Sequence, residues 1–177
     1  IFVTRNEYDA LGGHGAVREK VAEDLALAQL YFVTGRRSFM ILGLQQLSTR
    51  MYTSLREVID GWGKNLYVSG RDTAPFGKVG RFLYPLMLPT PALSGLVPPI
   101  VLALSLAGLF GLGVLLWAAL VTAANLLRWI VINAFLGLSP VYALLHPLGA
   151  ALLLYSALRS IVRGRHVRWK ERDYVVT

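Results

Sequence analysis

The sequence of 177 residues contains no cysteine. A disulfide framework, a thiolate nucleophile and a metal site with cysteine ligands are therefore excluded. The motifs G-x-x-x-x-G-K-[ST], G-x-S-x-G and H-E-x-x-H are also absent. These motifs mark P-loop nucleotide hydrolases, α/β-hydrolases and zinc proteases. The sequence gives no support to any of these three classes.

Charge is scarce, and it is missing altogether from two long stretches. No charged residue lies between Arg81 and Arg128, and residues 129–158 form another uncharged run. Each stretch exceeds the roughly 20 apolar residues that an α-helix needs to cross a bilayer. Charged residues make up 16% of the chain and apolar residues 55%, whereas soluble domains are about 25% charged. The sequence predicts an integral membrane protein.

The positive charge of the chain flanks these apolar stretches. Lys and Arg number 18 against 10 Asp and Glu, which gives a net charge of +8. The basic residues cluster at Arg71, Lys78 and Arg81 and again at residues 159–172. The positive-inside rule and attraction to anionic lipids explain this placement. We therefore expect a lipid bilayer as a partner and no nucleic acid.

The first 44 residues have the pattern of an α/β layer. Residues 1–4 and 38–42 are short β-prone runs, and residues 5–11 fit a short helix that ends at two glycines. Residues 16–33 fit a longer helix with a single apolar face. The apolar positions of that face are Val17, Val21, Leu25, Ala28 and Phe32. Helix, glycine turn and strand together predict part of an α/β domain. The segment starts with Ile-Phe-Val and has no signal-peptide pattern, as expected for the interior of a domain.

Residues 45–66 predict an amphipathic helix. One side is basic and the other carries tryptophan and leucine, as in helices at a membrane interface. The alternative is a surface helix packed on the α/β domain. Residues 67–78 are rich in Gly, Ser and Pro and read as a linker. The apolar side consists of Met51, Leu55, Val58, Ile59, Trp62 and Leu66, and the polar side of Arg50, Arg56, Asp60 and Lys64.

Three apolar helices are expected next, at about residues 92–112, 114–133 and 141–162. Three crossings would place the basic tail opposite the basic linker, against the positive-inside rule. A break at residues 146–147 or an extra half-helix at residues 82–91 would remove the conflict, and both alternatives stay open. The expected division is into residues 1–44 (α/β part), 45–81 (interface helix and linker), 82–162 (membrane helices) and 163–177 (basic tail).

The side chains that can carry chemistry lie before the apolar stretches. Glu23 and Asp24 form an acidic pair that can supply a general base, or a solvated pair in the first turn of a helix. His14 lies between glycines and can contact a phosphate or a hydroxyl, or simply occupy a turn. Arg50 and Arg56 can bind a diphosphate or lipid headgroups.

Four segments resemble family 2 glycosyltransferases that carry a GT-A domain and C-terminal membrane helices, and most closely the hopanoid-associated or lipid-directed group. Residues 5–13 resemble the R-x-x-Y-x-x-x-G-G segment of the family, and residues 21–28 resemble its E-D motif. Residues 50–65 are similar to its interface helix. Residues 167–174 resemble its W-K-G-R-x-Y ending, with Glu171 in place of the glycine.

The resemblance implies an inverting transfer of a sugar from a nucleotide-sugar donor to a membrane lipid. Asp24, beside Glu23, would be the catalytic base, on the cytoplasmic side of a bacterial-type inner membrane. Met51 stands where processive members have tryptophan after the arginine, which implies transfer of a single sugar. The residues expected to contact acceptor or diphosphate are Gly12, Gly13, His14, Arg50, Tyr52 and Trp62.

The D-x-D motif of the family is absent from this sequence. In the family it binds a divalent metal, Mg²⁺ or Mn²⁺, together with the nucleotide diphosphate. The resemblance therefore implies that the donor and metal site lies upstream of residue 1, that no metal site lies in this chain, and that the chain alone is inactive. The alternative function is a non-catalytic membrane anchor or assembly subunit.

Overall fold

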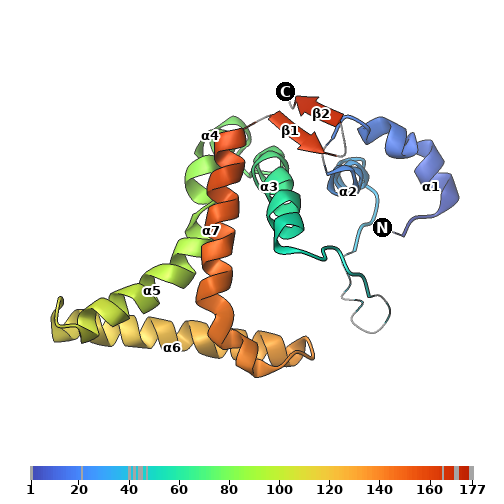
Figure 1. Ribbon diagram of the computed structural model, residues 1–177. Helices are drawn as coiled ribbons and strands as arrows, with labels where there is room; N and C mark the ends of the chain where they lie inside the picture. Colours follow the sequence, from blue (N-terminus) through green and yellow to red (C-terminus); the bar gives the residue numbers. More distant parts are fainter. Residues whose placement is uncertain are drawn as a thin grey trace. The chain divides into compact units, whose positions relative to one another are not determined.

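The computed structural model shows two compact units (Figure 1). One comprises Ile1–Tyr84 and Ser160–Thr177, and the other comprises Pro85–Arg159. The boundaries fall within helices α4 (Gly77–Met87) and α7 (His146–Arg163). The structure describes residues 2–20, 22–39, 41, 43, 46, 48–164, 166–169 and 172–175.

The first unit begins with three short helical elements. They are α1 (Arg5–Ala10), the 3₁₀ helix η1 (Gly13–Val17) and α2 (Glu23–Val33). An ion pair between Arg36 and Glu7 joins α1 to the residues that follow α2. Helix α1 confirms the helix predicted at residues 5–11 and is one residue shorter. The three elements meet in one small apolar core, which consists of Val17, Leu27 and Tyr31 with Tyr8, Leu11, Ala26 and Leu30 packed against it.

The predicted α/β fold is wrong. Residues 2–4, Phe39 and Ile41 have no strand structure, while Ile1, Met40 and Leu42 lie outside the described residues. A strand needs neighbouring strands to pair its backbone N–H and C=O groups. The described part of the chain offers none to these two runs. Phe39 and Ile41 are 84% and 87% exposed, so their apolar character does not place them in a core.

The predicted apolar face of α2 is also wrong. The helix begins at Glu23, so Val17 belongs to η1, and Val21 is outside the described residues. Leu25 is 41% and Phe32 75% exposed, whereas Leu27 and Tyr31 are buried. Leu27 and Tyr31, which are four residues apart, therefore form the buried side of α2, and this is not the predicted apolar side. The core contacts of η1 and α1 select this side, and the spacing of apolar residues alone does not reveal it.

Helix α3 (Leu55–Asp72) begins ten residues later than predicted and continues through the first half of the expected linker. Its start is fixed by a capping interaction. The Glu57 backbone N–H donates to Ser54 Oγ at 3.2 Å, and the Glu57 carboxylate accepts from the Thr53 backbone N–H at 2.8 Å. These bonds satisfy N–H groups that have no partner within the helix. The Ser54–Glu57 spacing therefore decides where α3 starts.

The Glu57 cap predicts a pH dependence of this end of α3. Hydrogen bonds from the Thr53 backbone N–H, and then from the Thr53 hydroxyl, lower the pKa of Glu57 below its ordinary value of 4.5. A lowered folded-state pKa adds stability that is present above 4.5 and is lost as pH falls through the folded-state value. We expect the Thr53 amide to lose protection from hydrogen exchange on acidification below 4.5. In Glu57→Gln this pH dependence should disappear. Equal protection of wild-type Thr53 above and well below that pH would contradict the assignment.

Helix α3 packs against α4 and α7 through polar contacts. The Tyr84 hydroxyl donates to the Leu66 carbonyl at 2.8 Å. The hydroxyl of Ser160 lies between two backbone groups of α3. It donates to the Gly63 carbonyl at 2.7 Å and accepts from the Tyr67 N–H at 3.0 Å. Ser160 thus bonds to both backbone groups of one i and i+4 pair of α3 and attaches the end of α7 to α3.

The C-terminal segment forms a β-hairpin that the sequence analysis did not predict. Strand β1 (His166–Trp169) pairs antiparallel with β2 (Arg172–Val175), with Trp169 opposite Arg172. Val167, Trp169, Tyr174 and Val175 are residue types that favour strands. The basic side chains between them led to the interpretation as a charged tail. This hairpin contains the segment that resembles the ending of the glycosyltransferase family.

The second unit consists of apolar helices. Helix α5 (Thr90–Leu106) packs along α6 (Leu112–Phe135), and α6 also packs against the 3₁₀ helix η2 (Pro140–Leu145) (Figure 1). The residues buried between helices are small, as in membrane bundles where small side chains allow close approach. They include Ala92, Ala118, Ala143 and Ala150.

Three helical segments are long and apolar enough to cross a membrane: Gly77–Leu106, Leu112–Phe135 and Pro140–Arg163. At about 1.5 Å per residue the 24 residues of α6 extend about 36 Å, longer than the roughly 30 Å hydrocarbon core. Only 6% of the most apolar window of α6 is buried, so most of its large side chains are available to lipid. By length and composition, the structure therefore confirms the prediction of three apolar helices that could cross a membrane. Helix α4 overlaps the expected half-helix at residues 82–91 only in part, and at His146 the chain changes from the 3₁₀ helix η2 to α7, so the two alternatives for an even number of crossings stay predictions.

Candidate functional site

The acidic pair lies in the first turn of α2. Glu23 and Asp24 are both exposed, and Asp24 Oδ1 accepts a hydrogen bond from the Leu25 N–H at 2.7 Å. The N-cap residue Ala22 has no side chain that can cap, so Asp24 satisfies one of the free N–H groups of the helix. The positive end of the helix dipole favours negative charge here. One carboxylate oxygen is used by the helix, and the other can accept a proton from a substrate.

The glycine loop before α2 is held by Tyr8. The His14 N–H donates to the Tyr8 hydroxyl at 2.9 Å, and that hydroxyl also lies 2.7 Å from His14 Nδ1. Gly12 and Gly13 have φ values of 76° and 54°, which side chains rarely adopt. A Cβ on Gly13 would lie 2.4 Å from the Tyr8 ring. Tyr8 therefore explains both the second glycine and the position of His14, and the predicted contact of His14 with substrate stays a prediction.

The other three predicted contact residues lie on or before α3. Arg50 is exposed, and Tyr52 packs against Gly61, where a Cβ would lie 2.3 Å from the Tyr52 hydroxyl. Trp62 is 50% exposed on α3. Within the described part of the chain, no hydrogen bond or ion pair connects these residues to the acidic pair. Their proposed contacts with acceptor or diphosphate remain predictions.

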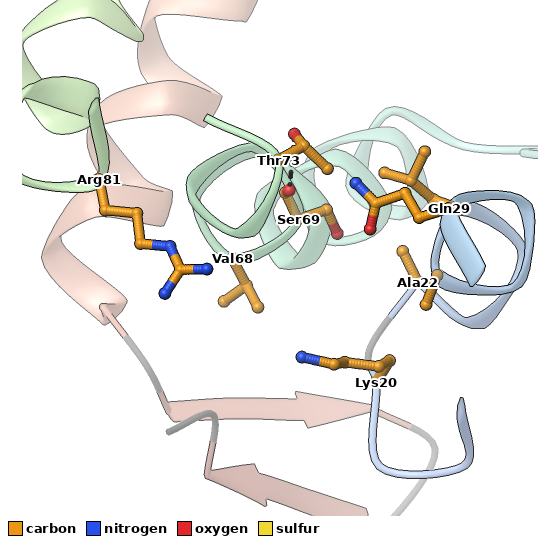
Figure 2. A pocket seen from close by; sticks show the side chains of 9 residues that line it. Lys20, Ala22, Gln29, Val68, Ser69, Thr73 and Arg81 are labelled. Carbon is orange, nitrogen blue, oxygen red and sulfur yellow. Dashed lines mark hydrogen bonds between the residues drawn. The ribbon is translucent and has the colours of Figure 1, made fainter. Parts of the chain in front are cut away.

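A cavity of about 210 Å³ lies beside the acidic turn of α2. Figure 2 shows the Lys20 ammonium and the Arg81 guanidinium extending into it toward one another. Among the described residues, the lining contains two cations and no acidic side chain. Ser69 Oγ, also in the lining, is buried and has no hydrogen-bond partner among the described residues. The described residues of the lining are Lys20, Ala22, Leu25, Ala26 and Gln29 before and on α2, Val68, Ser69 and Thr73 on or just after α3, and Arg81 on α4.

This cavity could not be predicted from the sequence. Lys20 and Arg81 are 61 positions apart in the sequence and belong to different elements, so no local motif connects them. Arg81 was interpreted only as part of the positive flank of the membrane region. The available signal was that Lys20 immediately precedes the acidic motif. Nothing in the sequence indicates that Arg81 comes close to it.

The described residues do not fit a divalent metal ion. Among them, no group of three or more His, Cys, Asp or Glu side chains could hold one. The Asp24 carboxylate is instead hydrogen-bonded to its own helix.

A second polar cluster lies within the apolar unit. The rings of Trp129 and His146 have centroids 5.0 Å apart, and Arg128 lies 5.7 Å from the centre of the Trp129 ring. His146 Nε2 and Trp129 Nε1 are buried without a hydrogen-bond partner. A Cβ on Gly95 would lie 2.7 Å from His146 Nε2. Gly95 thus provides the space that the imidazole occupies.

Comparison with known protein families, with characterised proteins and with solved structures gives no match for this chain. The resemblance to glycosyltransferases therefore depends on the four sequence segments described above.

Proposed function

We propose that this chain is the acceptor-binding, membrane-embedded part of an inverting family 2-like glycosyltransferase, which transfers one sugar from a nucleotide-sugar donor to a membrane lipid. The observation that carries the proposal is an exposed acidic pair, Glu23 and Asp24, beside a cavity whose charged side chains are Lys20 and Arg81. The acidic pair lies between Ala22 and Leu25, which both line this cavity, and an exposed carboxylate suits the removal of a proton from an acceptor hydroxyl.

In the proposed reaction Asp24 takes the proton of the acceptor hydroxyl. The oxygen forms a bond to the anomeric carbon while the bond from that carbon to the diphosphate oxygen breaks on the opposite face. The diphosphate leaves with the electron pair, and the configuration at the anomeric carbon inverts. Nearby cations stabilise the negative charge that develops on the leaving group.

The remaining elements position the lipid. The outward side of α3 exposes Leu55 and Trp62, which suits contact with the membrane interface. The apolar helices hold the site near the bilayer and so reduce the entropy cost of bringing acceptor and base together. We place the site on the cytoplasmic side of a bacterial-type inner membrane. The donor and a divalent metal, Mg²⁺ or Mn²⁺, are assigned to residues outside this sequence.

A second candidate function is a non-catalytic membrane anchor or assembly subunit. The bond from the Leu25 N–H to Asp24 favours it, because a capping role alone accounts for an aspartate at this position. In that case the acidic pair stabilises α2 and takes part in no reaction.

A transfer assay distinguishes the two functions. Membranes that contain the full-length protein carrying this sequence are incubated with a panel of radiolabelled nucleotide sugars, and the lipids are then extracted into organic solvent. The proposal predicts label in the lipid fraction with at least one donor, and none in membranes without the protein. Absence of label with every donor, from protein shown to be folded, would favour the anchor.

A further inference from the structure

We propose that Tyr8 holds His14 as the neutral tautomer whose hydrogen is on Nε2, and that this N–H donates a hydrogen bond to a phosphate oxygen of a substrate. Tyr8 is then a positioning residue, and His14 is a hydrogen-bond donor and not a base. The inference deepens the transferase proposed above and rests on that proposal only for the phosphate belonging to a substrate. The tautomer and the binding of phosphate can both be measured without any sugar transfer.

The Tyr8 hydroxyl makes two contacts with His14. Its oxygen accepts a hydrogen bond from the His14 backbone N–H at 2.9 Å, and it lies 2.7 Å from His14 Nδ1. A separation of 2.7 Å is typical of an O–H donor, whereas an N–H donor usually lies about 2.9–3.0 Å from an oxygen. The phenol therefore donates its single hydrogen to Nδ1, and Nδ1 carries none. In a neutral imidazole the hydrogen is then on Nε2.

The packing of Tyr8 keeps the imidazole in this contact. The centroids of the Tyr8 and His14 rings lie 5.6 Å apart, with the rings tilted by 50°. The Tyr8 ring also packs over the buried Gly13, where a Cβ would lie 2.4 Å from it. Tyr8 in turn packs against the apolar core of the first unit. The phenol is thus held by its own surroundings before any ligand binds, and it orients the imidazole in advance.

The other ring nitrogen of His14 is available to a ligand. His14 is exposed, and within the described part of the chain Nε2 has no hydrogen-bond partner. Because Nδ1 already accepts from Tyr8, the remaining polar position, Nε2–H, can only donate. A phosphate oxygen only accepts, so it matches this donor, whereas a hydroxyl would need a further partner for its own hydrogen. In the proposed reaction the acidic pair is therefore the base, and His14 holds the phosphate.

The tautomer is tested by ¹⁵N NMR of the full-length protein in neutral detergent, with selectively ¹⁵N-labelled histidine. Spectra are recorded at about pH 8.5, above the range of roughly pH 5–8 in which histidine usually titrates. The His14 signals are identified by their loss in His14→Asn. Wild-type His14 should carry a hydrogen on Nε2 alone. Tyr8→Phe should show both tautomers, because phenylalanine keeps the ring but has no hydroxyl. A hydrogen on Nδ1 in the wild type, or unchanged signals in Tyr8→Phe, would overturn the role of Tyr8.

Tyr31→Phe is the matched control for this substitution. Tyr31 lies in the small core against which Tyr8 packs, and its hydroxyl has no hydrogen-bond partner among the described residues. This variant should keep the wild-type His14 signals. If Tyr31→Phe changes the tautomer as much as Tyr8→Phe does, the effect comes from the packing of the core and the proposal is wrong.

Phosphate binding is tested with two substitutions of His14. Glutamine places its amide near the position of Nε2 and can still donate there, whereas asparagine reaches only the position of Nδ1. The probes are inorganic pyrophosphate, uridine diphosphate, dihexanoyl phosphatidic acid and methyl glucoside, which has hydroxyls but no phosphate. Binding to the full-length protein is measured by calorimetric titration. His14→Asn should weaken the binding of a phosphate probe at least about tenfold, the usual loss for a hydrogen bond to a charged group. His14→Gln should restore most of this binding.

Three results would overturn the assignment of the phosphate. They are no binding of any phosphate probe, an equal loss in the two variants, and a shift of the wild-type Nε2 signal by methyl glucoside as large as by the phosphate probes. Tighter binding of uridine diphosphate would support the proposal with the nucleotide-sugar donor as the source of the phosphate. Tighter binding of phosphatidic acid would support it with a lipid acceptor as the source.

The two proposals fail separately. Sugar transfer by a protein whose His14 carries its hydrogen on Nδ1 removes only the roles of Tyr8 and His14. The Nε2–H tautomer and phosphate binding without sugar transfer remove only the transferase.

Discussion

Asp24→Asn is expected to lower sugar transfer by roughly 10²–10⁴-fold, the usual contribution of a general base. An asparagine side chain has nearly the same shape, but its amide cannot take a proton from the acceptor hydroxyl. Its carbonyl oxygen can still accept the bond that the Leu25 N–H now donates to Asp24 Oδ1. The substitution therefore preserves the helix cap and removes only the proposed chemistry. Turnover in membranes that contain the full-length protein is the measurement, with nucleotide-sugar binding expected to stay nearly unchanged.

Asp9→Asn is the matched control for this experiment. Asp9 is also an exposed aspartate on a short helix, and its partner is Arg5 at 3.0 Å, an exposed pair worth at most about 1 kcal/mol. This variant should keep wild-type turnover. Substantial transfer by Asp24→Asn would contradict the assignment of the base and would leave Asp24 with the capping role alone.

Gly80→Ala is expected to cause the largest loss of stability of any glycine substitution in the first unit. A Cβ on Gly80 would lie 1.7 Å from the Pro75 carbonyl oxygen, a backbone atom that cannot rotate away. The start of α4 would have to shift, which typically costs about 1–3 kcal/mol. Gly70→Ala should cost less, although its Cβ would lie equally close to the Tyr84 hydroxyl, because a side chain can move. The unfolding free energy in detergent measures both effects.

Gly63→Ala provides the control for these substitutions. Gly63 lies inside α3, and apart from its chain neighbours and the backbone of its own helix no atom of the described residues lies within 4 Å of the position that its Cβ would take. Alanine is favoured over glycine within a helix by about 0.5–1 kcal/mol, so this variant should be unchanged or slightly more stable. A Gly80→Ala protein as stable as wild type would show that α4 does not approach Pro75 as described.

The membrane region was predictable from the sequence because it depends on composition rather than on tertiary contacts. An uncharged stretch whose helix is longer than the thickness of a bilayer can form few structures other than a membrane-spanning helix. The helix boundaries were less predictable. Pro98 and Pro99 lie inside α5, although proline usually ends a helix in water. In a membrane helix, neighbouring helices compensate for the lost hydrogen bonds.

The first unit was harder to predict because its structure depends on contacts between distant residues. The short runs at residues 1–4 and 38–42 have strand-forming residues but no neighbouring strand among the described residues to pair with. The buried side of α2 is chosen by Val17 and Tyr8, which pack against Leu27 and Tyr31. The start of α3, by contrast, was readable from Ser54 and Glu57, a capping pair that the sequence analysis overlooked.

In the candidate site too, the residues in local sequence motifs were predictable, whereas contacts between distant residues were not. Local motifs identified Glu23 and Asp24, and the structure places both in the first turn of α2. The motif Gly-Gly-His was also recognised, but its dependence on Tyr8 became clear only from the hydrogen bonds at His14. The cavity was not predictable, because Arg81 approaches Lys20 only after α3 and α4 have packed together.

The most direct test of the transferase is the mass spectrometry of lipids extracted from cells that produce the full-length protein. It needs no choice of donor or acceptor in advance. Wild-type protein should give a lipid whose mass exceeds that of a host lipid by one sugar unit, and cells with Asp24→Asn should lack it. The same lipid profile in cells with wild-type protein, with Asp24→Asn and without the protein would contradict the proposed function.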